Sequence, residues 1–280
     1  MSIELPEAQI LAGQMNDALC GRRILSYRLQ NHERLQRIGM LNKDERSFDL
    51  LNGGVISSAM SRGNTILMSL TNGANLILAP EYGGEVFFHK DAVSIPEKYH
   101  LRIDFADSTA LTVRLTSMGA INVSMHNDLA GSYVYRRDFN PDVLSPADKA
   151  FTLGAFANLL STKSTSLKPV LVGKDAVIVG LSNSAFQDVS YRARLHPKRA
   201  ASSLDDHEKR NLYDSIAALI KERIVKNGKE GFCDLYGRKG SYVPVMGPNM
   251  KGRSCPRCGA SIEMLHLGGG QVYICPSCQT

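Results

Sequence analysis

The sequence lacks the features of a membrane-spanning or exported chain. No uninterrupted apolar run reaches the roughly 18 residues that a membrane helix needs. Residues 1–14 contain acidic side chains and no basic cluster, so they do not resemble a secretory signal peptide. We therefore expect a cytoplasmic protein that has no membrane partner.

The chain also lacks internal repeats and low-complexity tracts, and its charge is only moderately unbalanced. It has 280 residues, of which 43% are hydrophobic and 21% charged, as in an ordinary globular protein. This length suits one large domain or two modest ones. Basic residues outnumber acidic residues by 33 to 27, which gives a formal charge of +6. The excess suits an anionic partner but does not identify one.

Cysteine is scarce outside the last 26 residues, where four of the six cysteines form two Cys-x-x-Cys pairs. The pairs are Cys255 with Cys258 and, after 16 intervening residues, Cys275 with Cys278. In a cytoplasmic chain this clustering favours a metal over disulfides. Because four thiolates from two tight turns suit a tetrahedral ion, the spacing predicts one structural Zn²⁺ ion. A redox-active or merely buried set of thiols is the alternative. We expect a zinc-finger hairpin over residues 265–274.

Hydrophobic periodicity divides the chain into a β-rich half and a helical half. It predicts a helix over 6–19, followed by antiparallel strands over 24–29, 64–70, 75–78, 85–89, 101–105, 110–115 and 120–125. Asn72-Gly73 predicts a hairpin turn. Helices are expected over 145–160, 167–171, 184–193 and 204–226. The first half is therefore expected to be a helix with an antiparallel β-sandwich or barrel, and the whole chain an α+β protein of several domains.

A polar turn precedes the most basic segment of the helical half. Gly180-Leu-Ser-Asn183 stands before an expected helix, and Tyr191-Arg-Ala-Arg-Leu-His-Pro-Lys-Arg199 follows. Backbone amides and an amide side chain at the start of a helix suit a phosphate group. An ordinary loop beside a solvated helix end is the alternative.

A series of short motifs runs along the whole chain in a recognisable order. They are Glu4-Leu-Pro-Glu7, Gly21-Arg-Arg-Ile24, Arg62-Gly63, Gly180-Leu-Ser-Asn183, Tyr191-Arg-Ala-Arg-Leu-His-Pro197, Tyr236-Gly-Arg238 and Cys275-Pro-Ser-Cys278-Gln279. Their order resembles the formamidopyrimidine-DNA glycosylase/endonuclease VIII family. The resemblance implies a monomer that flips a damaged nucleotide out of duplex DNA and excises its base. It also implies an N-terminal β-sandwich domain over 1–137, a helix-two-turn-helix domain over 138–235, and a linker with a zinc finger over 236–280.

The chain departs from the family at residues that usually carry chemistry. Family members usually begin with Pro-Glu-Leu-Pro-Glu, whose proline amine attacks the damaged nucleotide, but Ile3 stands at the proline position. Asn64 replaces a lysine after Arg-Gly, and Gly270 replaces the arginine of the finger. Ser117 stands where an arginine is expected, which leaves Met118 as the side chain to fill the gap left by the flipped base.

The resemblance still implies roles for the residues that remain. Glu4 would move protons at the sugar with Glu7 beside it, while Lys168 and Asn183 would hold phosphates. The further candidates for contact with DNA are Arg62, Asn64, Met118 and Arg238.

Three functions are compatible with this pattern. In the first, Glu4 activates a water molecule and the protein is a monofunctional glycosylase. In the second, the α-amine of Ser2 is the nucleophile and adds weak lyase activity at abasic sites. In the third, the protein recognises damaged or distorted duplex DNA in the nucleoid without catalysis. We favour a base excision repair enzyme, because a pure binding protein would have little reason to keep the Glu-Leu-Pro-Glu segment.

Overall fold

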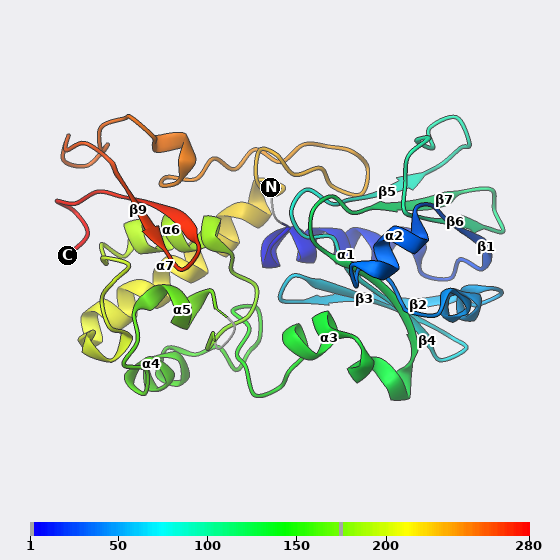
Figure 1. Ribbon diagram of the computed structural model, residues 1–280, viewed down its shortest axis with the longest axis horizontal. Coiled ribbons are helices and arrows are strands. Elements are labelled where there is room, and N and C mark those ends of the chain that lie inside the picture. Colours follow the sequence, from blue (N-terminus) through cyan, green and yellow to red (C-terminus); the bar gives the residue numbers. More distant parts are fainter. Residues whose placement is uncertain (1–2, 174–175) are drawn as a thin grey trace. The chain divides into compact units, whose positions relative to one another are not determined.

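The structure is a computed structural model that describes residues 3–173 and 176–280 (Figure 1). It divides into two compact units. The β-rich unit comprises residues 1–140 and 226–241, and the helical unit comprises residues 141–225 and 242–280. The three-domain division expected from the sequence stays a prediction. Among the described residues no helix is both long and apolar enough to cross a membrane.

Helix α1, Leu5–Leu19, opens the β-rich unit at the position expected from the sequence. Its first turn is a capping box, in which the Glu4 backbone N–H donates to Glu7 Oε2 at 3.1 Å and the Glu4 side chain accepts from the Glu7 backbone. Pro6 is tolerated in this turn because its missing N–H would have no partner inside the helix. The helix buries Leu11 and Met15 in the core of the unit.

Two four-stranded antiparallel sheets form the rest of this core. In sheet order the first contains β1 (Ile24–Leu29), β6 (Leu101–Phe105), β7 (Ala110–Arg114) and β5 (Glu85–His89). The second contains β2 (Ile56–Arg62), β3 (Thr65–Leu70), β4 (Ala74–Ala79) and β8 (Ala120–Met125). Buried residues of both sheets and of α1 share one hydrophobic cluster, and Figure 1 shows one sheet above the other. The expected sandwich is confirmed.

Strand β2 was not expected from the sequence. Its register against β3 shifts between Ile56 and Ser58, so buried and exposed positions do not alternate along it. A bulge of this kind breaks the two-residue period on which strand prediction rests. The hairpin turn at Asn72-Gly73 does join β3 to β4, and Gly73 has a φ of +84° there.

The helical unit contains α4 (Leu153–Ser161), α5 (Leu167–Leu171), α6 (Asn183–Arg192), α7 (Asp206–Val225) and the hairpin of β9 (Glu263–Leu267) and β10 (Gly270–Ile274). The helix expected over 145–160 is wrong in its first half. Residues 145–151 form turns, and Thr152 caps α4 by accepting from the Ala155 N–H at 3.2 Å. Short helices complete the described chain: α2 (His32–Arg37), α3 (Tyr133–Asp138) and the 3₁₀ segments Glu45–Leu51, His126–Gly131, Ala201–Ser203 and Pro248–Met250.

Candidate functional site

Three buried charged side chains meet at the start of α1. Glu4, Glu7 and Lys229 are each no more than 1% exposed. Lys229 Nζ lies 3.2 Å from Glu4 Oε2, and the Lys229 backbone N–H donates to Glu7 Oε1 at 3.1 Å. A buried charge is tolerated when it is paired and hydrogen-bonded. The ammonium of Lys229 therefore holds the Glu4 carboxylate in place, while the Glu7 carboxylate links two parts of the backbone.

Lys229 is 225 residues away from Glu4 along the chain, so no local pattern predicted their contact. The turn that carries it needs a glycine. Gly228 has a φ of +87°, and a Cβ there would lie 2.5 Å from the Phe232 ring and 3.1 Å from Glu7 Cγ. An Asn-Gly turn followed by a lysine was the one local signal in this segment.

Ile3 stands at the family's nucleophile position and is 3% exposed. It lines a hollow of about 60 Å³ together with Gly83, Gly84, Glu85, Gly231, Phe232 and Cys233. Such a hollow has room for a few water molecules but is far below the roughly 300 Å³ or more of an ordinary ligand pocket. The nitrogen of Ile3 is an amide and hence no nucleophile, because Ser2 precedes it. Ser2 itself lies outside the described residues.

The turn between β2 and β3 carries Arg62 and Asn64 and is anchored on Asp138. Asp138 Oδ2 accepts from the Asn64 backbone N–H at 3.1 Å and from Thr65 Oγ1 at 2.6 Å. Arg62 donates to the backbone carbonyls of Asp138 and Asn140. The side-chain oxygen of Asn64 is buried and has no hydrogen-bond partner among the described residues. Asn64 thus has an acceptor where the family usually has a cationic lysine.

Met118 and Arg238, two other candidates for contact with DNA in the β-rich unit, differ in whether neighbouring side chains hold them. Met118 precedes β8 and is 53% exposed, so its thioether is available to a partner. Arg238 is held by Asp234, whose Oδ2 accepts from Arg238 Nε at 2.8 Å, and its guanidinium lies over the Tyr236 ring.

In the helical unit, Lys168 and Asn183 come together at the tip of the β9–β10 hairpin. Lys168 Nζ donates to the Leu267 carbonyl, and Asn183 Nδ2 donates to the Gln271 carbonyl at 2.8 Å. Gly270 lies so close that a Cβ there would be 3.4 Å from Lys168 Nζ. Burial lowers the pKa of Lys168. An ammonium has three N–H donors and an amide two, so each side chain keeps donors for a further acceptor.

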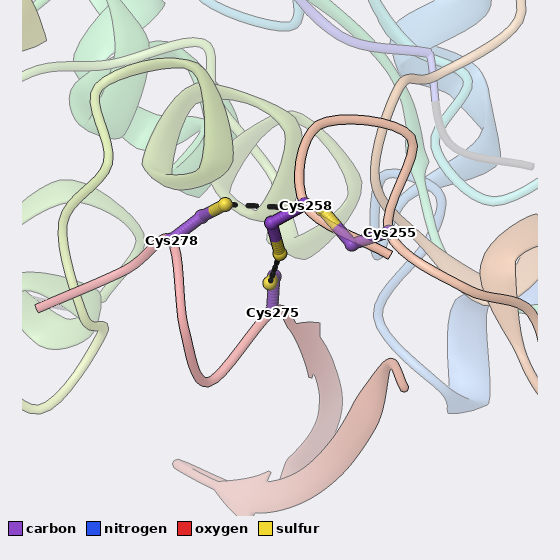
Figure 2. Close-up of side chains that lie close together, drawn as sticks. All are labelled: Cys255, Cys258, Cys275 and Cys278. Carbon is purple, nitrogen blue, oxygen red and sulfur yellow. Dashed lines mark hydrogen bonds between the residues drawn. The ribbon is translucent and has the colours of Figure 1, made fainter. Parts of the chain in front are cut away.

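The four C-terminal cysteines form a compact cluster, and Figure 2 shows their sulfur atoms turned toward one another. All four sulfurs lie within 4.8 Å, with Cys258 and Cys275 3.4 Å apart and Cys255 and Cys278 3.9 Å apart. Zn–S bonds of about 2.3 Å in a tetrahedron put sulfurs about 3.8 Å apart. The cluster therefore has the donor set and spacing of a four-thiolate metal site.

The surroundings of the cysteines act in opposite directions: burial raises the pKa of Cys275 and the hydrogen bond with Cys258 raises that of Cys278, whereas the pKa of Cys255 is lowered. Burial raises the pKa of Cys255, but hydrogen bonds from the Tyr191 hydroxyl and from the backbone amides of Arg257 and Cys258 outweigh it and lower the pKa overall. The hairpin is tied to α6, because the Tyr273 N–H donates to Gln187 Oε1 at 2.8 Å.

Comparisons with known proteins agree with this architecture. The formamidopyrimidine-DNA glycosylase N-terminal domain matches residues 3–117, and the formamidopyrimidine-DNA glycosylase H2TH domain matches residues 143–233. A formamidopyrimidine-DNA glycosylase of Heliobacterium modesticaldum is 28% identical over 283 residues, covering 99% of both chains. One from Streptococcus pyogenes serotype M3 is 26% identical over 285 residues, covering 99% of this chain and 98% of the relative.

Solved structures show the same fold. Lactococcus lactis Fpg in complex with DNA containing an abasic site has a TM-score of 0.84 at 21% identity, covering 99% of each chain. The same enzyme with DNA containing N7-benzyl-Fapy-dG has a TM-score of 0.83 at 22% identity, again covering 99% of each chain.

The sandwich, the helix-two-turn-helix domain and the four-cysteine hairpin are the parts of a DNA-glycosylase scaffold. The chain belongs to the formamidopyrimidine-DNA glycosylase/endonuclease VIII family, as its motifs indicated.

The ion pair at α1 makes a direct prediction for stability. Lys229→Met leaves the Glu4 carboxylate buried without its partner, so we expect the free energy of unfolding to fall by about 3–5 kcal/mol. Adding Glu4→Gln should restore part of the loss, because the orphaned charge is then removed. Urea unfolding of both variants measures this. Lys239→Met removes an exposed lysine of the same segment and is the control; equal stability of the two single variants would show that the pair is not structural.

Proposed function

We propose that this protein is a base excision repair glycosylase that binds duplex DNA at a damaged nucleotide and releases its base through water activated by Glu4. The observation that carries the proposal is the position of the Glu4 carboxylate. Lys229 holds this carboxylate in place, and the preceding residue, Ile3, lines a hollow that has room for water.

The chemistry of this step balances without an amine. Glu4 takes a proton from water as the water oxygen bonds to C1′ of the nucleotide and the bond from C1′ to the base breaks. The departing base leaves with its bonding electrons and is protonated. The product is an intact strand with an abasic site. In the competing route the Ser2 amine attacks C1′ instead and forms a Schiff base, after which the strand is cleaved.

The DNA-binding part of the proposal rests on the net positive charge of the chain and on side-chain N–H donors. The chain carries a formal charge of +6, and Lys168 and Asn183 offer N–H donors beside the start of α6. The solved relatives bound to abasic and modified DNA share this fold. Arg62, Asn64, Met118 and Arg238 are the further contacts that we propose for DNA.

A second candidate is recognition of damaged DNA without catalysis. It is favoured by burial, because Lys229 is 1% exposed and Glu4 is 0% exposed, so neither side chain reaches solvent in this structure.

We also propose that Cys255, Cys258, Cys275 and Cys278 hold one Zn²⁺ ion. Four thiolates leave no open coordination position, so this ion would be structural. The cluster packs with Tyr191, Met246 and Tyr273 in one hydrophobic group, so the metal would stabilise the hairpin against α6.

Metal removal tests this site. We expect one zinc per chain, and a strong chelator should remove it and lower the thermal unfolding temperature, because structural zinc contributes folding free energy. Cys275→Ser should fail to retain the ion, whereas Cys20→Ser, at an exposed cysteine outside the cluster, should retain it. Metal analysis of the purified variants measures both. A wild-type chain that folds with no metal would contradict the assignment.

Replacing the proposed general base separates chemistry from binding. Glu4→Gln should abolish base release and leave affinity for damaged duplex nearly unchanged. The measurement is a single-turnover incubation with duplexes carrying oxidised, alkylated and abasic sites, with the DNA analysed by mass spectrometry.

The products distinguish the candidate functions. An intact abasic strand supports water attack, and a cleaved strand that borohydride traps on the protein supports the Ser2 amine. Unchanged DNA with tight binding supports recognition alone. Glu97→Gln, at an exposed acid, is the control and should keep full activity.

The proposed contact of Asn183 with DNA phosphates is tested by measuring the affinity of the protein for duplex DNA. Asn183→Ala should weaken binding about tenfold for every duplex alike, since a hydrogen bond to a charged group contributes about 1.5–3 kcal/mol. Wild-type affinity should also fall steeply with added salt. Equilibrium titrations at several salt concentrations, with the exposed Asn249→Ala as control, measure both. A loss limited to damaged DNA would place Asn183 in lesion recognition instead.

A further inference from the structure

One face of α6 carries three polar side chains that bond to the C-terminal hairpin and its cysteines. Asn183, Gln187 and Tyr191 follow one another at intervals of four residues, so they lie on the same side of the helix. Asn183 donates to a carbonyl of β10 at 2.8 Å, and Gln187 accepts from an N–H of the same strand at 2.8 Å. The Tyr191 hydroxyl lies 3.3 Å from Cys255 Sγ. The first two contacts align the hairpin on the helix, whereas the third reaches a proposed metal ligand.

Packing fixes the Tyr191 ring in this position. Tyr191 is 2% exposed and belongs to the hydrophobic group that surrounds the cysteines. Arg257, in the turn between Cys255 and Cys258, donates to the Tyr191 carbonyl at 2.7 Å. The guanidinium carbon of Arg257 also lies 4.2 Å from the centre of the Tyr191 ring, within the range of a cation–π contact. The phenol therefore has little freedom to turn its hydroxyl away from the sulfur.

The hydroxyl is the donor whenever Cys255 holds a metal, because a metal-bound cysteine is a thiolate and has no proton to give. The Arg257 backbone N–H donates to the same sulfur at 3.4 Å. Four thiolates outweigh the charge of one Zn²⁺ ion, so the metal-bound site is anionic. An O–H and an N–H that point at one sulfur disperse part of that charge. The positive side chain of Arg257, stacked on the phenol, acts in the same direction.

We propose that the Tyr191 hydroxyl is a positioning residue of the metal site and sets how tightly the four cysteines retain zinc. The inference rests on the zinc assignment within the proposed function and does not depend on the chemistry of base release. Tyr191 does not touch the metal; it acts through Cys255, whose sulfur it orients and whose charge it stabilises. Removing a hydrogen-bond partner of a metal ligand typically costs about ten- to hundredfold in metal affinity.

The test is a competition for zinc between the full-length protein and a chelator of known affinity. Tyr191→Phe keeps the packed ring and loses only the hydroxyl, so its zinc affinity should be about tenfold lower, or 1.4 kcal/mol. Tyr213→Phe is the matched control, because Tyr213 lies in the same unit and its hydroxyl donates to the Phe151 carbonyl at 3.0 Å. This control should bind zinc as the wild type does.

Cobalt substitution shows whether the hydroxyl acts on the sulfur itself. Co²⁺ held by thiolates has an absorption band in which an electron moves from sulfur to the metal. A hydrogen bond lowers the energy of the sulfur electrons, so the band of Tyr191→Phe should move to longer wavelength. The band of Tyr213→Phe should not move. A tyrosine that only packed beside the site would leave the band unchanged.

Three results would overturn the proposal and leave the zinc site and the glycosylase assignment intact. They are equal zinc affinity of Tyr191→Phe and the wild type, an equal loss in Tyr191→Phe and Tyr213→Phe, and a cobalt band that does not move in Tyr191→Phe. Wild-type protein that folds but binds no metal would overturn the zinc assignment and this inference with it. Far-ultraviolet circular dichroism of each variant confirms that it is folded.

Discussion

The buried ion pair of Glu4 and Lys229 is the interaction on which the candidate active site depends. Two opposite charges removed from water stabilise each other only while they stay in contact, so each fixes the position of the other. Glu7 extends the contact, since its two oxygens accept from the backbone of both partners. The start of α1 is thereby joined to the segment that follows α7. The capping box of α1 is therefore also part of the candidate active site.

At the positions that the motif order assigns to the family's cationic and nucleophilic groups, both units carry other residues. In the β-rich unit, Ile3 presents an amide nitrogen, and the side-chain oxygen of Asn64 has no hydrogen-bond partner in the described part of the chain, so neither residue supplies an amine. In the helical unit, Gly270 leaves space that Lys168 and Asn183 fill by donating to the hairpin carbonyls. A Cβ at residue 270 would lie 3.4 Å from Lys168 Nζ, which is an ordinary van der Waals contact, so the hairpin packs directly against Lys168 at this point.

The two hollows of the β-rich unit differ in what they can hold. The smaller one, beside Ile3, has a volume suited to water, whereas the larger, lined by residues of β8 and α3, has the volume of an ordinary ligand pocket at about 500 Å³. The turn over residues 80–84 separates them because its glycines allow close approach of backbone.

Local patterns in the sequence were sufficient for features that depend on neighbouring residues. The spacing of the cysteines predicted the four-sulfur cluster, because each Cys-x-x-Cys turn presents two sulfurs by itself. Periodicity predicted α1, α7 and most strands. It missed β2, which contains a bulge, and it started α4 too early, before the Thr152 cap. Motif order was enough to indicate the family. Lys229, the hollow beside Tyr133 and the hairpin contacts of Lys168 were decided only by tertiary structure. Each depends on groups distant along the chain whose pairing is set by burial, and burial has no signature in the local sequence.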